Sequence, residues 1–452
     1  MGAGIQSRPS HGMRTFFTIW FGQLVSLLGS QLTGFALGVW VYDQTHSVSM
    51  LAFTQVALQA PYVLLSPVAG VFADRWNRRT AMIVSDFGAG IAVMTIGALF
   101  LTHHLQAWMV IPINLWMSTF HTLMWPSLTA ATTLLVPKEH YGRASAFTQL
   151  GEALPAIAGP ALAGILYASI QLGKMALIDF ASYAFSVLLM LLFVRIPNPT
   201  VTIQEARGKG SIWTEMRFGW DYIIVRKGLL ALLILFLISN FLTGIIGPLI
   251  TPLILDNWNA STLGFLSTLM GTGMLTGTLV MSAWGGTRRK IHTLLSANLL
   301  AGVFLFAVGL RASLPLIAVC GFGVMFCSPF INASSQAIWQ AKVAPDLQGR
   351  VFAIRRAIAW SASIVAPLLA APLTDYLFKP AMSIGGILAP VLGPIFGVGA
   401  SRGVGVVFSM VGVLSIASGL IMWNVRRLRR VELELPDHDL VVQHASENQP
   451  GE

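Results

Sequence analysis

A series of long, uninterrupted apolar stretches constrains this chain more than any other feature. Hydrophobic residues make up 55% of its 452 residues and charged residues 10%, whereas a soluble globular protein carries about 25% charged residues. So little charge cannot cover a water-facing surface, and so many apolar residues exclude a disordered chain. The runs are about twice as long as the alternating ten-residue strands of a membrane β-barrel. The sequence therefore predicts an all-α polytopic membrane protein.

Twelve of these runs have the length of a membrane span, about 20 residues. The polar stretch 196–228 separates six spans from six. We therefore expect an N-terminal six-helix bundle at 1–195, a cytoplasmic linker with an amphipathic surface helix at 196–228, a C-terminal bundle at 229–425 and a disordered cytoplasmic tail at 426–452. The predicted spans are 15–42, 49–72, 80–102, 107–136, 144–169, 175–195, 229–255, 261–284, 291–310, 314–341, 351–377 and 403–425.

The lysines and arginines orient the predicted spans. With a cytoplasmic N-terminus, 24 of the 28 positive residues fall on the cytoplasmic side and four, Lys174, Arg311, Lys379 and Arg402, fall outside. Cytoplasmic loops of membrane proteins carry this excess, so we expect a multi-pass protein of the cytoplasmic (inner) membrane with both termini in the cytoplasm. The net charge of +10 then needs no nucleic-acid site, because no basic stripe with interleaved aromatic residues is present.

The two halves of the chain repeat one another. The segment Val136 to Phe147 follows span four and the segment Val343 to Ile354 follows span ten, and their shared Val, Gly-Arg and Ala residues are separated by a constant offset of 207 residues. Pro160 and Pro367 have the same offset. Parallel repeats of six spans are related by an axis along the membrane normal, with a substrate site at their interface. The repeat therefore predicts alternating access around a cavity between two pseudo-symmetric halves.

Two motifs resemble those of the major facilitator superfamily, and the resemblance covers nearly all of the chain. The segment from Gly70 to Arg79 is similar to that family's loop between spans two and three. The segment Gly159-Pro160-Ala-Leu-Ala-Gly164 is similar to the span-five signature of its exporting, proton-coupled members, with Ala163 where a second Gly is usual. The stretch from Phe120 to Pro137, the Gly349-Arg350-Val-Phe junction and the Gly-rich insertion 378–402 are similar to those of the branch that holds the enterobactin exporter and the macrolide-efflux proteins.

The resemblance implies a major facilitator fold and export of a hydrophobic or amphipathic small molecule, such as a drug, a macrolide or a siderophore-like product. It implies a proton gradient as the energy source and no cofactor. In the family, the carboxylate at the position of Asp74 contacts span eleven and locks the outward-facing state. For Arg78 and Arg79, a role as orientation signals stays equally open. The candidates for this conformational gate are Gly70, Asp74, Arg75, Arg78, Arg79, Arg355 and Arg356.

Ionisable groups inside the bilayer are costly and are functional candidates by default. Glu152 lies about nine residues beyond Arg143, which places it about 14 Å into a hydrocarbon core about 30 Å thick. Removal from water favours the neutral form of a carboxyl group, as a proton carrier requires. Recognition of a cationic substrate and a hydrogen-bonded packing role are the alternatives. His121, also near mid-depth, is the second proton-coupling candidate, although a lone histidine in an apolar helix more often packs.

The remaining acids are expected to be structural. Asp86 lies within reach of Arg79, with which we expect it to pair. Asp179, Asp256 and Asp375 lie near the outer ends of spans, where we expect them to be interfacial. Polar residues within spans are candidates for lining the cavity, without a decision on which helix face each occupies. These cavity candidates are Gln23, Gln31, Gln55, Gln59, Asn240, Gln336 and Trp360.

The sequence contains no H-E-x-x-H, paired D-x-x-D or G-x-S-x-G motif, so neither an enzyme nor a metal site is expected. We expect a monomer whose partners are a small-molecule substrate and the lipid bilayer. The alternatives are an uncoupled facilitator or an importer, which would transport equally with the pH gradient collapsed, and a membrane-embedded enzyme, which would need a polar catalytic cluster.

Overall fold

The computed structural model describes residues 9–137, 140–196 and 212–434, except for the side chains of 9–11, 66–75, 212–216 and 345–346. Regular structure within these ranges is entirely helical. The chain divides into two compact units. The N-terminal unit comprises Met1–Val201 and Ile254–Thr268, and the C-terminal unit comprises Thr202–Leu253 and Leu269–Glu452. The all-helical membrane fold predicted from the sequence is confirmed, while the predicted tail from 435 onward lies outside the described residues.

The N-terminal unit is built mainly from six helices and a short 3₁₀ turn, η1. These elements are α1 (Pro9–Thr45), α2 (Val48–Arg75), α3 (Arg78–Leu101), η1 (Ala107–Met109), α4 (Val110–His121), α5 (Met124–Leu135) and α6 (Tyr141–Phe193).

The remaining elements belong mainly to the C-terminal unit. They are α7 (Ile212–Val225), α8 (Lys227–Ile246), η4 (Gly247–Leu249), α9 (Ile250–Leu255), α10 (Ala260–Trp284), α11 (Lys290–Leu310), α12 (Leu314–Lys342), α13 (Pro345–Leu373), the π-helical turn η5 (Thr374–Phe378), α14 (Lys379–Met382), α15 (Ala389–Phe396), α16 (Ala400–Asn424), α17 (Arg426–Arg429) and α18 (Val431–Glu434).

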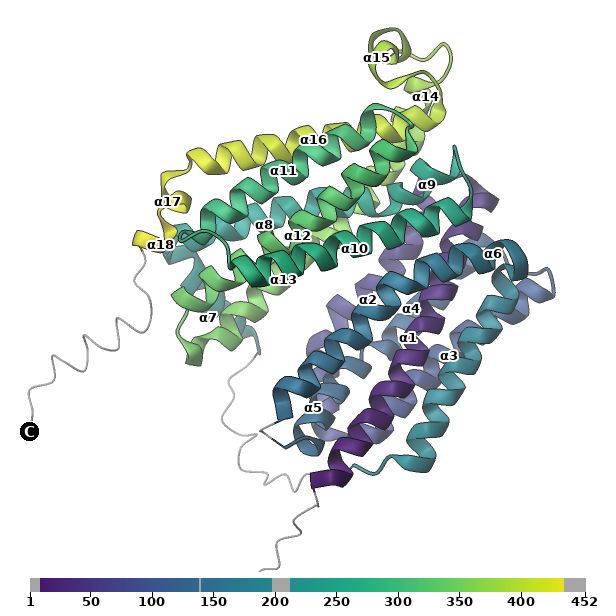
Figure 1. The fold of residues 1–452 in the computed structure, drawn as a ribbon, viewed down its shortest axis with the longest axis vertical. Coiled ribbons are helices and arrows are strands. Elements are labelled where there is room, and N and C mark those ends of the chain that lie inside the picture. Colours follow the sequence, from purple (N-terminus) through teal and green to yellow (C-terminus); the bar gives the residue numbers. More distant parts are fainter. Residues whose placement is uncertain (1–8, 138–139, 197–211, 435–452) are drawn as a thin grey trace, which may run out of the picture. The chain divides into compact units, whose positions relative to one another are not determined.

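Ten helical segments of the described chain are long and apolar enough to cross a membrane, and two local breaks relate them to the twelve predicted spans. The 53-residue α6 contains a non-helical residue, Gln171, with φ of 54°, and the chain turns back there (Figure 1). It therefore supplies the fifth and sixth spans. Helices α4 and α5 together fill the fourth span and are separated at Thr122–Leu123. Pro126 lies just beyond this break, and its ring nitrogen cannot donate to the carbonyl of Thr122.

Close packing of α1 against α6 organises the N-terminal unit. Helix α1 lies between the two arms of α6, with α3 against the second arm (Figure 1). Gly29 permits this approach, because a Cβ atom there would lie 2.4 Å from Ser182 Oγ and 2.7 Å from Asp179 Oδ1. Small residues at such contacts let helix backbones approach in a membrane, where lipid provides no hydrophobic drive for association. Near the C-terminal end of α1, Trp40 is buried with Met175 of α6 in one hydrophobic core.

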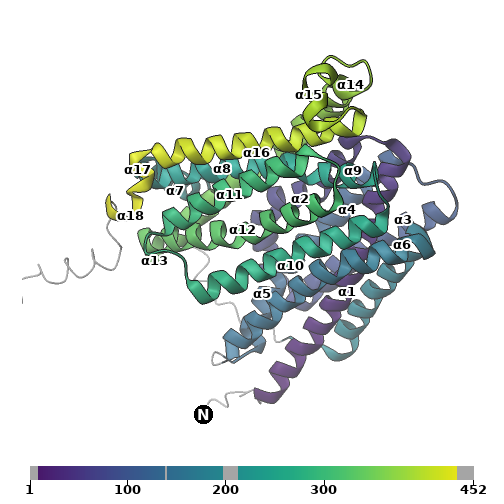
Figure 2. The ribbon, with the colours of Figure 1, turned by 45° about the horizontal axis from the view of Figure 1, so that its top comes forward.

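The C-terminal unit packs α8, α11, α12, α13 and α16 around a second core (Figure 2). Trp339 of α12 is fully buried there beside Ile354 of α13. The predicted amphipathic helix of the linker is α7, and it packs against α13. Ile223 is fully buried. A Cβ atom added to Gly219 would lie 2.9 Å from the carbonyl oxygen of Arg350. Helix α13 thus covers the side of α7 that carries Gly219 and Ile223, while Phe218 and Trp220 of the same helix are exposed.

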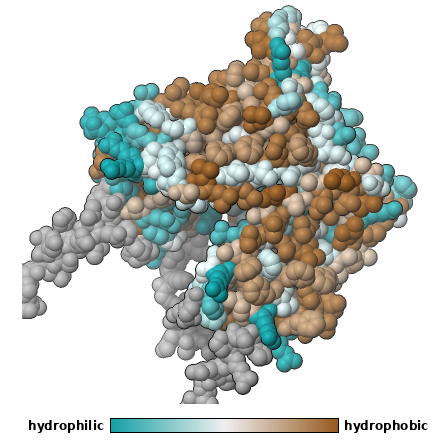
Figure 3. Space-filling model, viewed as in Figure 1, coloured by the Kyte–Doolittle hydropathy of each residue, from teal (hydrophilic) through white to brown (hydrophobic). Residues whose placement is uncertain are grey.

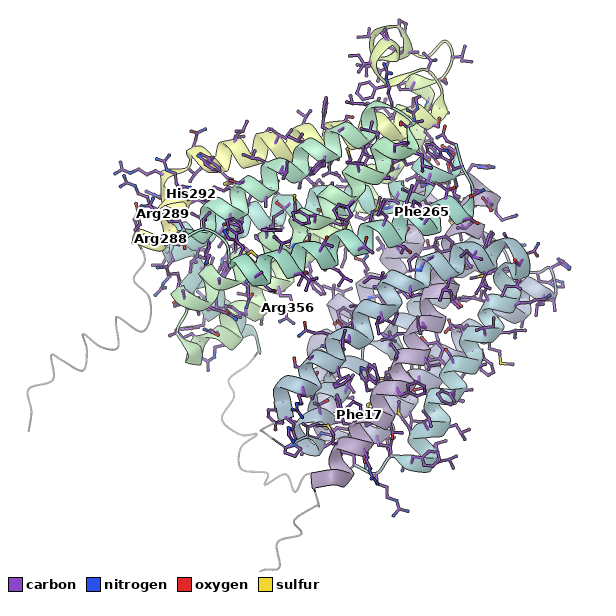
Figure 4. All side chains as sticks on the ribbon, in the orientation of Figure 1. Phe17, Phe265, Arg288, Arg289, His292 and Arg356 are labelled. Atoms are coloured by element: carbon purple, nitrogen blue, oxygen red, sulfur yellow. The ribbon has the colours of Figure 1, made fainter. Side chains whose placement is uncertain are left out.

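The surface matches a bilayer environment. Apolar side chains cover the sides of the helices over much of the visible face, while polar side chains gather around α17 and α18 (Figure 3). Arg288, Arg289 and His292 lie together where α11 begins (Figure 4). Charge at helix ends and apolar residues along helix sides are what a spanning bundle requires.

We expect Gly29→Ala to destabilise the protein by about 1–3 kcal/mol, because the added methyl group would overpack the α1–α6 contact. Gly34→Ala is the matched control on the same helix, since a Cβ there meets nothing within 4 Å; it should be neutral or stabilising by about 0.5–1 kcal/mol through helix propensity. The midpoint of thermal unfolding of the purified protein in detergent measures both. Equal midpoints for the two variants would contradict the packing argument.

Candidate functional site

The N-terminal unit contains a pocket of about 370 Å³ between α5 and the first arm of α6, which we call the N-terminal pocket. Glu152 lies on its wall with an exposed side chain. Apart from Glu152, the polar side chains of the wall are uncharged hydroxyl and amide groups. The lining residues are Trp125, Leu128, Thr129, Thr132, Thr133, Tyr141, Ser145, Thr148, Gln149 and Glu152.

Glu152 has neither a hydrogen bond nor an ion pair with any described residue, so no base among the described side chains neutralises its carboxyl group. The neighbouring hydroxyl groups donate elsewhere: Thr129 Oγ1 donates to Trp125 O at 3.0 Å, and Thr148 Oγ1 donates to Ala144 O at 2.9 Å. The sequence predicted a carboxyl group held away from water. The structure instead places it on a hollow, where it can exchange a proton or meet a cation.

The C-terminal unit contains a second pocket, of about 210 Å³, between α8, α12 and α13, which we call the C-terminal pocket. It brings together three of the predicted cavity residues, Asn240, Gln336 and Trp360, with two of the predicted gate residues, Arg355 and Arg356. The lining residues are Phe236, Asn240, Asn332, Gln336, Phe352, Arg355, Arg356, Ala359 and Trp360.

Sequence reasoning missed four residues of this pocket, Phe236, Asn332, Phe352 and Ala359. The first three lie four residues before Asn240, Gln336 and Arg356, and Ala359 lies four residues after Arg355. Residues four apart share one face of a helix, so this spacing would have found all four once the exposed face of each helix was known.

The remaining candidates lie outside the two pockets. His121 is half-buried at the end of α4, next to the break before α5. Gln55 and Gln59 lie on α2 and do not line either pocket. For Gly70, Asp74 and Arg75, only the position on α2 is known, because their side chains lie outside the described residues.

The span-five signature acts through close packing. A Cβ atom on Gly159 would lie 2.5 Å from Gln31 Cβ, so this glycine seats α1 against α6, and Gln31 occupies that contact. A Cβ atom on Gly164 would lie 2.9 Å from Ala260 O at the start of α10. Pro160, between them, leaves one backbone acceptor of α6 without its helical donor. The signature therefore positions helices and contributes no polar group to the N-terminal pocket.

The predicted pair of Asp86 with Arg79 is wrong. Asp86 is 1% exposed and accepts hydrogen bonds from Gln23 Nε2 at 2.9 Å and Ser186 Oγ at 2.7 Å. Arg79 instead donates to the carbonyl oxygens of Met190 and Leu191 at the end of α6, where free carbonyls require donors. Gln23 is thereby committed to Asp86 inside the helix bundle, and its expected place on a cavity wall is also corrected.

The predicted interfacial position of Asp179 is wrong as well. It is 1% exposed between α1 and the second arm of α6, where its Oδ1 accepts from Ser30 Oγ at 3.4 Å and from Ser182 Oγ at 3.3 Å. Asp256 and Asp375 do lie toward chain turns: Asp256 accepts a hydrogen bond from Tyr42, and Asp375 forms an ion pair with Lys379 at 3.1 Å.

Two units of apolar, membrane-length helices, each with a small pocket, fit a polytopic membrane transporter. The family model of the Major Facilitator Superfamily matches residues 19–243 and 232–379. The chain belongs to this superfamily, as its motifs predicted.

Similar proteins include exporters. The chain is 27% identical over 428 residues to macrolide efflux protein A of Streptococcus pyogenes, covering 93% of this chain and 98% of the relative. It is 24% identical over 306 residues to the enterobactin exporter of Shigella flexneri, covering 67% and 70% of the two chains. Among solved structures, a bacterial homologue of the human lysosomal transporter Spinster has a TM-score of 0.71 at 12% identity, covering 95% of this chain and 99% of the homologue. That last likeness shows the fold alone.

We expect Asp86→Leu to destabilise the N-terminal unit, because Gln23 and Ser186 would lose a buried acceptor, at about 1–3 kcal/mol for each unsatisfied group. Asp86→Asn keeps a carbonyl oxygen for one of these donors and is expected to lose less. Thermal unfolding of the purified variants compares them with the unmodified protein. If Asp86→Leu unfolds no earlier than Asp86→Asn, the network does not support the fold.

Proposed function

We propose that this chain exports a hydrophobic or amphipathic small molecule across the cytoplasmic membrane by proton antiport and alternating access. Membership of the superfamily and likeness to a macrolide efflux protein and an enterobactin exporter support export of such a cargo. We further propose that it acts as a monomer in the bilayer, with the proton gradient as energy source and without a cofactor.

The observation that carries the proton coupling is the unpaired carboxyl group of Glu152 on the N-terminal pocket. A carboxylate without a neutralising base binds a proton readily when water is scarce, and the same group attracts a cation when it is ionised. Protonation from the outside and cargo binding from the cytoplasm or inner leaflet then compete. The gradient drives export because proton and cargo have different affinities for the two access states.

The conformational gate is a separate part of the proposal. We assign the loop from Gly70 to Arg79 to the control of access, with Asp74 as its carboxylate. The bonds of Arg79 to the carbonyl oxygens of Met190 and Leu191 support a link between this loop and the second arm of α6. These hydrogen bonds of Arg79 would hold the loop to the second arm of α6 while Asp74 changes its contacts between the two access states.

We expect Glu152→Gln to abolish gradient-driven export while leaving abundance and thermal stability near those of the unmodified protein. The amide has nearly the same shape but cannot release a proton in this pH range, and Glu152 makes no contact whose loss would unfold the bundle. The measurement is accumulation of a macrolide inside energised inverted membrane vesicles, whose cytoplasmic face is outside, with the pH gradient intact and then collapsed by an ionophore.

Asp221→Asn is the matched control, because Asp221 is an exposed carboxylate on α7, 4.0 Å from Arg217. It should export at the unmodified rate. Unchanged export by Glu152→Gln would remove Glu152 from the mechanism. Equal transport by the unmodified protein with and without the pH gradient would favour an uncoupled facilitator.

The charge distribution gives an independent prediction of topology. A fluorescent protein fused at the C-terminus should fluoresce, and alkaline phosphatase fused there should be inactive, because the excess of basic residues holds both termini in the cytoplasm. Fusion of the same reporters within the loop between α15 and α16 should give the opposite pattern. The reverse result at either position would overturn the proposed orientation.

A further inference from the structure

The two pockets occupy equivalent positions in the two repeats. Adding the offset of 207 residues to Trp125, Thr129, Ser145, Thr148, Gln149 and Glu152 gives Asn332, Gln336, Phe352, Arg355, Arg356 and Ala359, and both sets line pockets. The sequence repeat was defined from other residues, so this agreement shows that one ancestral hollow has been kept twice.

The equivalent pockets differ in charge. The N-terminal pocket has one carboxylate, Glu152, whose counterpart in the C-terminal pocket is the uncharged Ala359. The C-terminal pocket has two guanidinium groups, Arg355 and Arg356, where the N-terminal pocket has a hydroxyl and an amide. Duplication has thus given two pockets of opposite sign.

Arg355 is held in a fixed position. Its Nη1 donates to Gln336 Oε1 at 3.0 Å, and its Nη2 donates to Ser335 Oγ at 3.2 Å. Its guanidinium carbon lies 5.1 Å from the ring centroid of Trp339 and 5.7 Å from that of Phe236, within the range of cation–π attraction. These partners are all neutral, so they orient the charge without cancelling it, and the fork keeps further N–H donors for a ligand.

Arg356 provides a second positive charge with no assigned partner. It is exposed on α13 (Figure 4) and forms neither a hydrogen bond nor an ion pair with the residues that the structure describes. The lining of the pocket includes no acid. Two adjacent like charges repel one another, and a bound anion would relieve this repulsion while accepting from both groups.

We propose that the C-terminal pocket binds the acid group and adjoining ring of an amphipathic organic anion, which places organic anions among the cargoes of this chain. The pocket is smaller than the roughly 300–1,000 Å³ that encloses a drug-sized ligand, so it accommodates one part of the cargo. Phe236, Phe352 and Trp360 supply apolar surface for the ring, and Asn240 and Asn332 supply amide groups at the wall. This inference rests on the proposed export function, because it specifies the cargo.

The test measures binding at equilibrium to the full-length protein in nanodiscs of phosphatidylcholine. The probes are 1-naphthoate, an aromatic anion, and 1-naphthamide, its uncharged counterpart, with bound fractions obtained by equilibrium dialysis. The unmodified protein should bind naphthoate at least about tenfold more tightly than naphthamide, because a hydrogen bond to an ionised group is roughly twice as strong as a neutral one. The preference should weaken as salt is raised.

Arg356→Gln should remove the preference for naphthoate and leave naphthamide binding unchanged, while Arg356→Lys should keep most of the preference. Asn332→Asp, which places a carboxylate on the wall and removes no arginine, should also abolish the preference. Arg289→Gln is the control, since it deletes an arginine outside the pocket and should bind both probes like the unmodified protein.

Equal binding of the two probes by the unmodified protein, no binding of naphthoate, or a preference that survives Arg356→Gln would each overturn the proposal. Displacement of naphthoate by phosphatidylglycerol in the nanodisc would also overturn it, by identifying a lipid headgroup as the occupant. The binding measurement needs no pH gradient, so it can contradict the anion site without contradicting proton-coupled export. Export is tested separately, by transport in vesicles that contain the Glu152→Gln variant.

Discussion

The lack of water in the hydrocarbon core is the constraint on which the rest of this structure depends. Every backbone donor and acceptor at that depth must be satisfied within the protein, and a helix satisfies them within one segment. Two acids buried between α1, α3 and α6 are held by side-chain donors. Gln23 and Ser186 donate to Asp86, and Ser30 and Ser182 donate to Asp179 Oδ1. Gly29 and Gly159 let the helices come close enough for such contacts.

That rule separates structural polar groups from candidates for function. Asp86, Gln23 and Ser186 bind one another inside a helix interface, and their removal concerns stability. Glu152 and Arg356 lie on pockets without such partners, so their charges remain available to a proton or a ligand. Acids within the apolar spans thus differ in what they contact: Asp86 has buried hydrogen-bond donors, whereas Glu152 lies on a pocket.

Duplication explains how a single fold acquired two sites of different chemistry. The helices that enclose the two pockets correspond at an offset of 207 residues, because both repeats must pack the same helix pairs. The residues that line the two pockets do not have to pack against a neighbouring helix in the same way. At these positions Glu152 corresponds to Ala359, and Gln149 corresponds to Arg356. Divergence at a few exposed positions therefore changes charge without changing the fold.

The sequence by itself determined the helical class, the spans, the repeat and the superfamily, because bilayer thickness and helix rise set the length of each apolar run. It also singled out Glu152 and five of the nine residues of the C-terminal pocket. It misplaced Asp86, Asp179 and Gln23, since depth along a span can be counted from its ends but the direction of a side chain around the helix cannot. Only the tertiary structure decided which faces meet α1 and α6 and which face a pocket, because neighbouring helices set the rotation of each helix about its axis.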